Sequence, residues 1–373
     1  MIAPRALPDS PRFVYGPVPS RRLGYSLGID LLPHKNCSFD CVYCQVGRTT
    51  QKTVRRRDFF PVADILAQVR EALRAGKTID CVTLSGTGEP TLYRSLGTLI
   101  REIKKASGLP VAVLTNGSLL YRKAVRSGLA EADIVIPTLD AADQAVLARV
   151  NRPHASLHFD RILRGLHAFR REFPGRIWLE VMLIKGMNDH PAHLRRLRPL
   201  IEALSPDRVQ INTVVRPPAE KYARPLSRTA LERARALLGG DSEIIADFNP
   251  LRGIPRTLIR GGIANSPLRG QAAVSQYSRS RINGSMGALQ RLQRVDPTDV
   301  SPWSFRKLGR SHASALRGED VLAVLKRRPV TPKDLALALG RPAHEVQAHL
   351  AALVRKGRAR PVSHKGRRYF EAR

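Results

Sequence analysis

Residues 81–117 read CVTLSGTGEPTLYRSLGTLIREIKKASGLPVAVLTNG. Two short apolar runs, CVTLS from Cys81 and VAVLT from Val111, flank an amphipathic stretch at residues 95–107 that has the length and period of a helix. A buried strand, a helix and a second buried strand are typical of a βαβ unit in a parallel sheet. This stretch therefore predicts an α/β fold.

The same alternation continues on both sides of this unit. Further helical patterns are VADILAQVREALRAG (62–76) and FDRILRGLHAFRREF (159–173). The other predicted strands begin at Ser26, Asp133, Ile177 and Arg208. Six βα units predict a partial (βα)6 TIM-like barrel over residues 1–249, and in such barrels functional groups gather where the strands end.

Polar and glycine-containing motifs follow all six predicted strands. In chain order they are PHKNCSFDCVYC (33–44), SGTGEP (85–90), TNG (115–117), Asp140, KGMND (185–189) and VVRPPAE (214–220). Because these strands are predicted to be parallel, we expect the motifs to share one functional face.

Three of the four cysteines, Cys37, Cys41 and Cys44, lie within one short loop. Such a cluster in a reducing compartment indicates a metal or redox site. Three thiolates at this spacing can bind three corners of a cubane iron–sulfur cluster and leave one iron open. A closed zinc site is the alternative, with His34 as a candidate ligand. Cys81 lies in an apolar run and is predicted to be a core residue.

Composition limits the class of protein. The formal charge of +32 favours a polyanionic partner. A hydrophobic share of 43% and a charged share of 25% are ordinary for globular proteins and exclude wholesale disorder. No run approaches the roughly 18 apolar residues that span a bilayer. We therefore expect a cytoplasmic protein without a membrane partner.

The last third of the chain predicts a linker and a second domain. Residues 250–317 are rich in Gly, Ser and Arg without a sustained period, which is typical of a basic, flexible linker. Residues 318–373 show three helical patterns and a hairpin with Lys365-Gly366 at its turn. Thr331 is the predicted N-cap of the second helix, and Gly340 its end. This segment resembles a winged helix-turn-helix.

A winged helix predicts a nucleic-acid partner, tRNA or DNA. The helix from Ala343 to Lys356 would enter a groove, and basic residues of the wing would lie near phosphates. Those residues are Arg358, Arg360, Lys365, Arg367 and Arg368. Winged helices also bind polypeptides, and the candidate recognition helix has few base-reading side chains, so polypeptide docking stays open, as does an ordinary solvated surface.

The CxxxCxxC motif with Tyr43 before its last cysteine, followed by a GEP loop, resembles the radical S-adenosylmethionine (radical SAM) superfamily over roughly residues 14–247. GPVPSRRLG (16–24), DCVYCQVGRTT (40–50), SGTGEPTL (85–92) and VQINTVVRPPAE (209–220) look like its wyosine-synthase-like branch. The chain has no further cysteine cluster for the second iron–sulfur centre expected of wyosine synthases, which argues against wyosine formation.

The resemblance implies the cofactors and their chemistry. Cys37, Cys41 and Cys44 would hold a [4Fe-4S] cluster whose open iron chelates the amine and carboxylate of S-adenosylmethionine. An electron from a donor such as a flavodoxin or ferredoxin would cleave the sulfonium, giving methionine and a 5'-deoxyadenosyl radical that abstracts hydrogen from a substrate.

The resemblance also implies roles for single residues. Gly86 and Gly88 would let the backbone approach the methionyl group, with Thr87 where the motif usually has its first glycine, and Glu89 would accept from the ammonium. The other implied contacts are Tyr43 near the adenine, Asn116 and Asp140 on the ribose, and Arg216 on an anionic substrate group. Asn116 and Asp140 could equally form turns or caps, the Asn188-Asp189 pair could contact the cofactor or cap the next helix, and Arg216 could be simply solvated.

Two classes of function follow. In the first, a radical SAM enzyme acts on tRNA or another nucleic-acid-associated substrate recruited by the winged helix. In the second, the enzyme modifies or activates a peptide or protein that the winged helix docks. A third class, a DNA-binding redox sensor, is disfavoured because a sensor needs no methionine-binding glycines.

Overall fold

The computed structural model describes residues 11–239, 242–246, 316–326, 329–339, 341–364 and 366–373. The predicted linker, residues 250–317, lies outside these ranges except for its last two residues, and so do Gly340 and Lys365. Within the described ranges, no helix has both the length and the apolar character needed to cross a membrane.

Eight strands form one sheet in the order β1-β2-β5-β6-β7-β8-β9-β10. Their bounds are β1 Val14–Ser20, β2 Gly24–Ile29, β5 Cys81–Leu84, β6 Val111–Thr115, β7 Ile134–Pro137, β8 Arg176–Leu183, β9 Arg208–Thr213 and β10 Glu243–Ile244. All neighbours from β2 to β10 are parallel, and β1 runs antiparallel to β2 at the edge. The six predicted strands are therefore confirmed.

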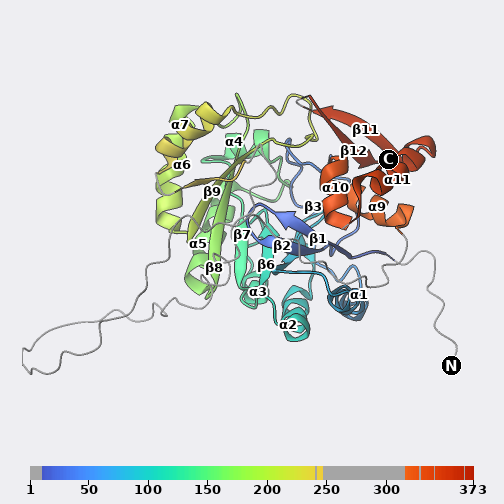
Figure 1. Ribbon diagram of the computed structural model, residues 1–373. Coiled ribbons are helices and arrows are strands. Elements are labelled where there is room, and N and C mark those ends of the chain that lie inside the picture. Colours follow the sequence, from blue (N-terminus) through green and yellow to red (C-terminus); the bar gives the residue numbers. More distant parts are fainter. Residues whose placement is uncertain (1–10, 240–241, 247–315, 327–328, 340, 365) are drawn as a thin grey trace, which may run out of the picture.

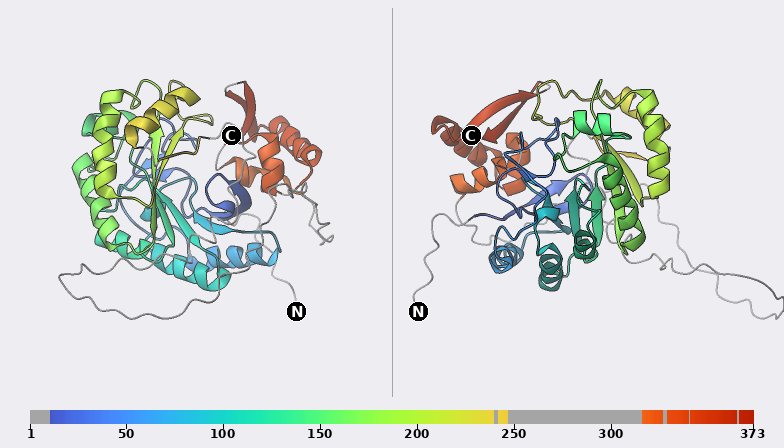
Figure 2. Two further views of the ribbon diagram at one scale, coloured as in Figure 1. Left: turned by 60° about the vertical axis from the view of Figure 1, so that its left-hand side comes forward. Right: turned by 180° about the vertical axis from the view of Figure 1, so that it is seen from behind.

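Helices cover the outer side of this curved sheet (Figures 1 and 2). Their bounds are α1 Val62–Arg74, α2 Leu96–Ser107, α3 Lys123–Leu129, α4 Gln144–Val150, α5 Phe159–Glu172, α6 Pro191–Leu204 and α7 Arg228–Leu238, with a short 3-10 turn at Pro90–Leu92. The three helices predicted from amphipathic stretches coincide with α1, α2 and α5. The α/β fold with a parallel sheet is confirmed, and its form is that of an incomplete barrel.

The two faces of the sheet have separate cores. Alternate strand residues such as Leu84, Val113 and Leu179 pack against the helices in the main core. On the opposite face Cys81, Ile134 and Trp178 belong to a smaller cluster. Cys81 is fully buried there, which confirms the prediction of a core cysteine.

Side-chain hydrogen bonds and an ion pair connect the β1–β2 edge of the sheet with its β8–β10 edge. Arg21, in the turn between β1 and β2, donates to the carbonyl oxygen of Ile245 at 2.9 Å. Its neighbour Arg22 forms an ion pair with Glu180 on β8 and also donates to Gln210 on β9. The basic motif at residues 16–24 therefore helps to close the barrel.

The C-terminal module, which comprises the described residues from 316 to 373, has its own core. It contains α9 Gly318–Leu325, α10 Pro332–Leu339, α11 Ala343–Arg355, β11 Ala359–His364 and β12 Arg367–Ala372. β11 and β12 form an antiparallel hairpin, and Val330 pairs with Phe370 as a third strand position. The Oγ1 of Thr331 accepts from the backbone N–H of Asp334 at 3.1 Å, so the predicted N-cap is confirmed.

The C-terminal module packs against the edge of the barrel (Figure 1). α9 and α10 contact β1, and Arg12 forms an ion pair with Asp320. On the hairpin, the hydroxyl of Tyr369 donates to the carbonyl oxygen of Val215 at 3.3 Å. The hairpin therefore reaches the loop that follows β9, which is one of the six loops of the predicted functional face.

Candidate active site

The loop of the three cysteines is fixed at both ends by backbone hydrogen bonds. It lies between two short strands, β3 Asn36–Cys37 and β4 Gln51–Lys52, which pair in parallel. The N–H of Val42 donates to the carbonyl of Val150 at 3.0 Å, at the end of α4. The loop is thus held at its base by the pairing of β3 with β4 and in its middle by the end of α4.

Each of the three sulfurs receives one N–H donor from another part of the site. Lys35 Nζ lies 3.1 Å from the Sγ of Cys44. The side-chain amide of Asn116 lies 3.6 Å from the Sγ of Cys37, and that of Asn151 lies 3.5 Å from the Sγ of Cys41. Donors to sulfur favour the thiolate form, which is the form that binds a metal.

The sulfurs are arranged differently from the ligands of a single metal ion. In the described part of the chain, no three His, Cys, Asp or Glu side chains converge as such a site requires. A closed zinc site with His34 is therefore not formed in this structure. Burial raises the pKa of the Cys37 thiol to about 12, and burial also raises the pKa of Cys41. Thiols of this kind ionise when a metal binds them, so this loop suits a metal cluster better than redox exchange.

The two glycines after β5 are required by contacts within the protein. A Cβ on Gly86 would lie 2.3 Å from the carboxylate of Asp30, and one on Gly88 would lie 2.1 Å from the carbonyl oxygen of Asn36. Between them, Thr87 is buried, its N–H lies 3.2 Å from Asp30 and its carbonyl accepts from the N–H of Lys35 at 3.1 Å. The glycines thus bring this loop against the cysteine loop.

Glu89 is buried and accepts four hydrogen bonds from the protein. One oxygen accepts from Thr91 N at 3.0 Å, Thr91 Oγ1 at 2.6 Å and Thr115 Oγ1 at 2.6 Å. The other oxygen accepts from Asn116 N at 2.7 Å. Desolvation raises the pKa of this carboxyl against the opposing effect of those donors. Glu89 therefore joins the ends of β5 and β6, and its second oxygen keeps acceptor capacity for an ammonium.

Asn116 forms a turn and also contacts the cysteine loop with its side chain. Its side-chain oxygen accepts from the N–H of Ser118 at 3.0 Å, which confirms the turn alternative. Its side-chain nitrogen donates to Ser38 at 2.9 Å and points to Cys37. The predicted ribose contact stays a prediction.

Asp140 connects the cysteine loop, the end of α4 and strand β8, and it is not a helix cap. Its carboxylate accepts from the hydroxyl of Tyr43 at 2.6 Å, from Asn151 at 2.7 Å and from the N–H of Met182 at 2.8 Å. The cap of the following helix, α4, is Asp143. Asp140 thus fixes the ring of Tyr43, and the implied ribose and adenine contacts of these two residues stay predictions.

Burial of Asp140 gives a testable pH dependence. Desolvation raises the pKa of Asp140 from 3.8 to about 7. Between these values the folded state keeps a proton that the unfolded state has lost, so stability falls as pH rises. This carboxyl should cost about 3 kcal/mol of unfolding free energy between pH 5 and pH 8. In urea unfolding, Asp140→Asn should flatten that decline, and a decline as steep as that of the unaltered chain would contradict this assignment.

The Asn188-Asp189 pair does not cap the next helix. Asn188 is fully buried and donates to the carbonyl oxygens of Asp140 and Met182. The N-cap of α6 is His190, whose ring accepts from the N–H of Ala192. The cap prediction was therefore wrong, because Asn188 holds the loop after β8 against Asp140.

Comparisons with known proteins agree with this arrangement. The model of the radical SAM superfamily matches residues 31–197. A UPF0026 protein of Synechocystis sp. is 40% identical over 205 residues, which are 55% of this chain and 76% of that protein. The chain belongs to the radical SAM superfamily. The cofactors of this superfamily are a [4Fe-4S] cluster and S-adenosylmethionine.

Other relatives of this radical SAM protein match over different shares of their length. A UPF0026 protein of Methanocaldococcus jannaschii is 41% identical over 57% of this chain and 66% of that protein. A protein named GTPase Obg from Brachyspira hyodysenteriae is 42% identical over 63% of this chain and 34% of that protein. The chain thus spans less than two thirds of either relative. A radical SAM methyltransferase from Sphaerobacter thermophilus superposes with a TM-score of 0.47 at 19% identity, over 60% of this chain and 67% of that structure.

The residues around the cysteines fit the two radical SAM cofactors. The thiols supply sulfur ligands on one loop. Near this loop, three buried polar atoms have no hydrogen-bond partner among the described residues: Asn36 Oδ1, Thr87 Oγ1 and Asn151 Oδ1. Buried polar atoms of this kind are normally satisfied, so a ligand or water is expected beside them. All three residues adjoin the cysteine loop or contact it.

Arg216 lies beside the cysteine loop of this radical SAM site. Its guanidinium donates to the side-chain oxygen of Gln45 at 3.0 Å, and Gln45 directly follows Cys44. Next to it, Glu220 forms ion pairs with Arg48 at 3.0 Å and with Arg152 at 2.7 Å. The loop after β9 thus brings Arg216 and the ion-paired Glu220 beside the cysteine loop, and the substrate contact of Arg216 stays a prediction.

The basic residues of the predicted wing differ in their partners. Arg358 forms an ion pair with Glu319 at 2.6 Å, and Arg360 forms one with Glu371 at 2.7 Å. Arg367 and Arg368 are exposed on β12. The charge of the wing is therefore partly neutralised, which sequence reasoning missed because the acidic partners lie far along the chain or on the facing strand.

Sequence reasoning also missed three residues of the site. Lys35 and Asn151 donate to cluster ligands, and Asp30 supports the glycine loop. Lys35 stands two residues before Cys37, so its position was a usable signal. Asn151 lies more than a hundred residues away from the cysteines, and no pattern in the sequence connects them.

Proposed function

We propose that this chain is a radical SAM enzyme that abstracts hydrogen from a tRNA or another nucleic-acid-associated substrate. When bound, the cluster and S-adenosylmethionine supply the reductive cleavage and the hydrogen abstraction. The observation that carries the proposal is the meeting of three cysteine sulfurs, the Glu89 loop and the Tyr43–Asp140 pair at one end of the sheet.

In this proposal the protein residues bind and orient. The three cysteines hold the cluster, while Glu89 keeps the ends of β5 and β6 together and accepts from the ammonium of the cofactor. Asp140 holds the ring of Tyr43 in place. Because both carboxylates are buried, their hydrogen bonds are stronger than they would be in water.

Charge on two neighbouring surfaces supports a nucleic-acid substrate. The mouth of the barrel carries exposed Arg48, Lys52 and Lys221, and Arg216 lies close by. The C-terminal module, which we interpret as a winged helix, adds Arg367 and Arg368. Tyr369 of the same hairpin contacts the loop that carries Arg216. A nucleic-acid backbone bound to the hairpin would therefore extend toward the cysteine loop.

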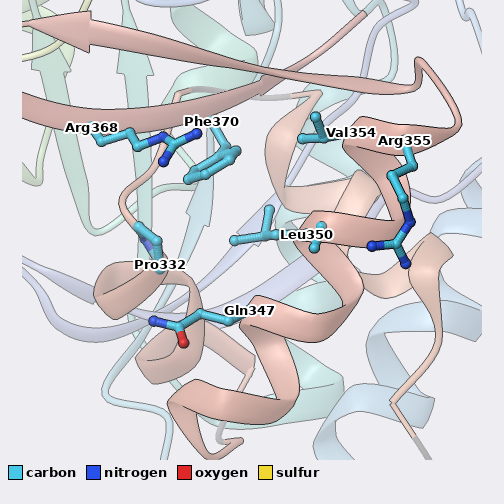
Figure 3. A pocket seen from close by; sticks show the side chains of 8 residues that line it. Pro332, Gln347, Leu350, Val354, Arg355, Arg368 and Phe370 are labelled. Atoms are coloured by element: carbon cyan, nitrogen blue, oxygen red, sulfur yellow. The ribbon is translucent and has the colours of Figure 1, made fainter.

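One specific observation favours the alternative, a peptide or protein substrate. A hollow of about 350 Å³ lies between α11 and β12 (Figure 3). Leu350, Val354 and Phe370 form its apolar floor, and Arg355 and Arg368 lie at its rim. An apolar side chain next to an acidic group would fit such a hollow better than a sugar–phosphate backbone would.

Binding of labelled tRNA to the full chain tests the nucleic-acid proposal. We expect affinity to fall by at least about a hundredfold between 50 and 200 mM salt, because phosphate contacts release counterions. The double variant Lys365→Ala/Arg367→Ala should reduce the logarithmic salt slope by about two. Arg198→Ala, on α6 outside the barrel, is the matched control and should leave the slope unchanged.

Two outcomes would contradict the nucleic-acid proposal. The first is the absence of tRNA and duplex DNA binding at low salt. The second is binding whose salt slope is the same in the double variant and in the control. Either result would favour the peptide alternative, for which Ala351→Glu in the hollow should abolish binding of a peptide substrate.

A further inference from the structure

Lys35 is a buried cation beside the cysteine loop. The residue is only 3% exposed, and its ammonium donates to the Sγ of Cys44 at 3.1 Å. None of the ion pairs found among the described residues joins Lys35 to a carboxylate, and the side-chain hydrogen bond of Lys35 goes to a cysteine sulfur. The molecule therefore buries a positive charge whose partners are the cluster ligands.

The backbone holds this lysine in an unusual conformation. Lys35 has φ of +54°, in the left-handed region that residues other than glycine seldom adopt. Its N–H donates to the carbonyl of Thr87 at 3.1 Å, and its carbonyl accepts from the N–H of Gln51 at 3.2 Å. The glycine loop and β4 thus fix the residue so that its side chain reaches Cys44.

Among the described residues, the side-chain donors to the other two sulfurs are neutral. Asn116 donates to Cys37 and Asn151 donates to Cys41, at longer distances than that from Lys35 to Cys44. Hydrogen bonds to sulfur and nearby charge are among the factors that set the reduction potential of an iron–sulfur cluster. Lys35 contributes both, whereas each asparagine contributes a hydrogen bond alone.

Burying an isolated ammonium in a protein interior is strongly unfavourable unless an opposite charge compensates it. Three thiolates around a cluster supply that compensation. A cluster held by these cysteines would gain one electron from the external donor when it is reduced, with no bond formed or broken. The negative charge near Lys35 increases, so the ammonium stabilises the reduced form more than the oxidised form.

We propose that Lys35 is the internal counter-ion of the cluster and raises its reduction potential through the sulfur of Cys44. Lys35 is thus a positioning and tuning residue and not a catalytic one. The inference rests on the proposed function only in requiring that the three cysteines carry a cluster.

The test is a redox titration of the anaerobically reconstituted full chain in the absence of S-adenosylmethionine. The electron paramagnetic resonance signal of the reduced cluster monitors the titration and gives the midpoint potential. Lys35→Met should shift the midpoint potential to a more negative value. Lys52→Met is the matched control, because Lys52 lies at the end of the same loop, is exposed and donates to the carbonyl of Arg152. Its potential should equal that of the unaltered protein.

A Lys35→Met cluster with the unaltered potential would overturn the proposal. If the Lys35→Met variant binds no iron, the Lys35→Arg variant distinguishes charge from packing. Iron binding by Lys35→Arg at an unchanged unfolding temperature would show that the site needs a positive charge and would support the proposal. Loss of iron binding in both variants would show that the site needs only the packing of the lysine side chain and would overturn the proposal. Failure of the proposed function is recognised separately, because the unaltered protein would then bind no cluster or would leave S-adenosylmethionine intact.

Discussion

Replacing Cys37, Cys41 or Cys44 with alanine, one at a time, is expected to abolish both cluster assembly and cleavage of S-adenosylmethionine. Each sulfur would bind a different iron of the cluster, and the loop offers no substitute, because the remaining cysteine, Cys81, is buried in the core on the inner face of the sheet. Iron content, visible absorbance and 5'-deoxyadenosine release after anaerobic reconstitution measure the effect.

Cys81→Ala is the matched control for these three variants. This substitution removes a buried sulfur from the small hydrophobic core that contains Ile134 and Trp178, and it should lower the free energy of unfolding by about 1 kcal/mol. Its iron content and activity should equal those of the unaltered chain. Full iron binding in any of the three loop variants, or loss of iron in Cys81→Ala, would contradict the assignment of ligands.

Gly88→Ala is expected to have the second large effect. The new Cβ would lie 2.1 Å from the carbonyl oxygen of Asn36, which also accepts from the N–H of Glu89 at 3.0 Å. Since Asn36 directly precedes Cys37, relief of this overlap must move a cluster ligand or Glu89. We expect a loss of about 1–3 kcal/mol in unfolding free energy and a cluster that is lost readily, measured by urea unfolding and by iron content.

Gly128→Ala provides the control for this substitution. Gly128 lies in α3, where an added Cβ would approach Gly97 no closer than 3.5 Å, an ordinary contact. Alanine is the better helix former, so this variant should be as stable as the unaltered chain or more stable. If the two substitutions have equal effects on stability and iron content, the close approach of the glycine loop to Asn36 is not needed for cluster binding.

The strands of the barrel could be predicted because each is a short apolar run followed by polar residues. β1 could not be predicted in the same way. Its sequence, VYGPVPS, contains two prolines, which argue against a central strand but are tolerated at an edge. β10 has only two residues, so it offers no periodicity to detect.

The cysteine ligands and the glycine loop could be predicted from their motifs, but the structure adds a reason for the glycines. Gly86 and Gly88 were expected to make room for a cofactor, and their missing Cβ atoms also make room for Asp30 and Asn36. Such contacts depend on how two loops meet in space, which local sequence does not determine. For the same reason Asn151, which donates to Cys41, was missed, whereas Lys35 could have been found from its position two residues before Cys37.

The polar residues at strand ends illustrate the same limit. The position of Asp140 after a strand correctly placed it in the site, yet its three hydrogen bonds come from loops and strands far apart in the sequence. For the Asn188-Asp189 pair the sequence left a cofactor contact and a helix cap open, and the buried contact of Asn188 with Asp140 could not be predicted from composition.

Anaerobic incubation of the iron-loaded full chain with S-adenosylmethionine and a strong reductant decides whether the three cysteines carry a working radical SAM cluster. We expect methionine and 5'-deoxyadenosine to form in equal amounts, and neither to form with the Cys44→Ala variant. If S-adenosylmethionine remains intact after incubation with protein of full iron content, the three cysteines do not carry a working radical SAM cluster.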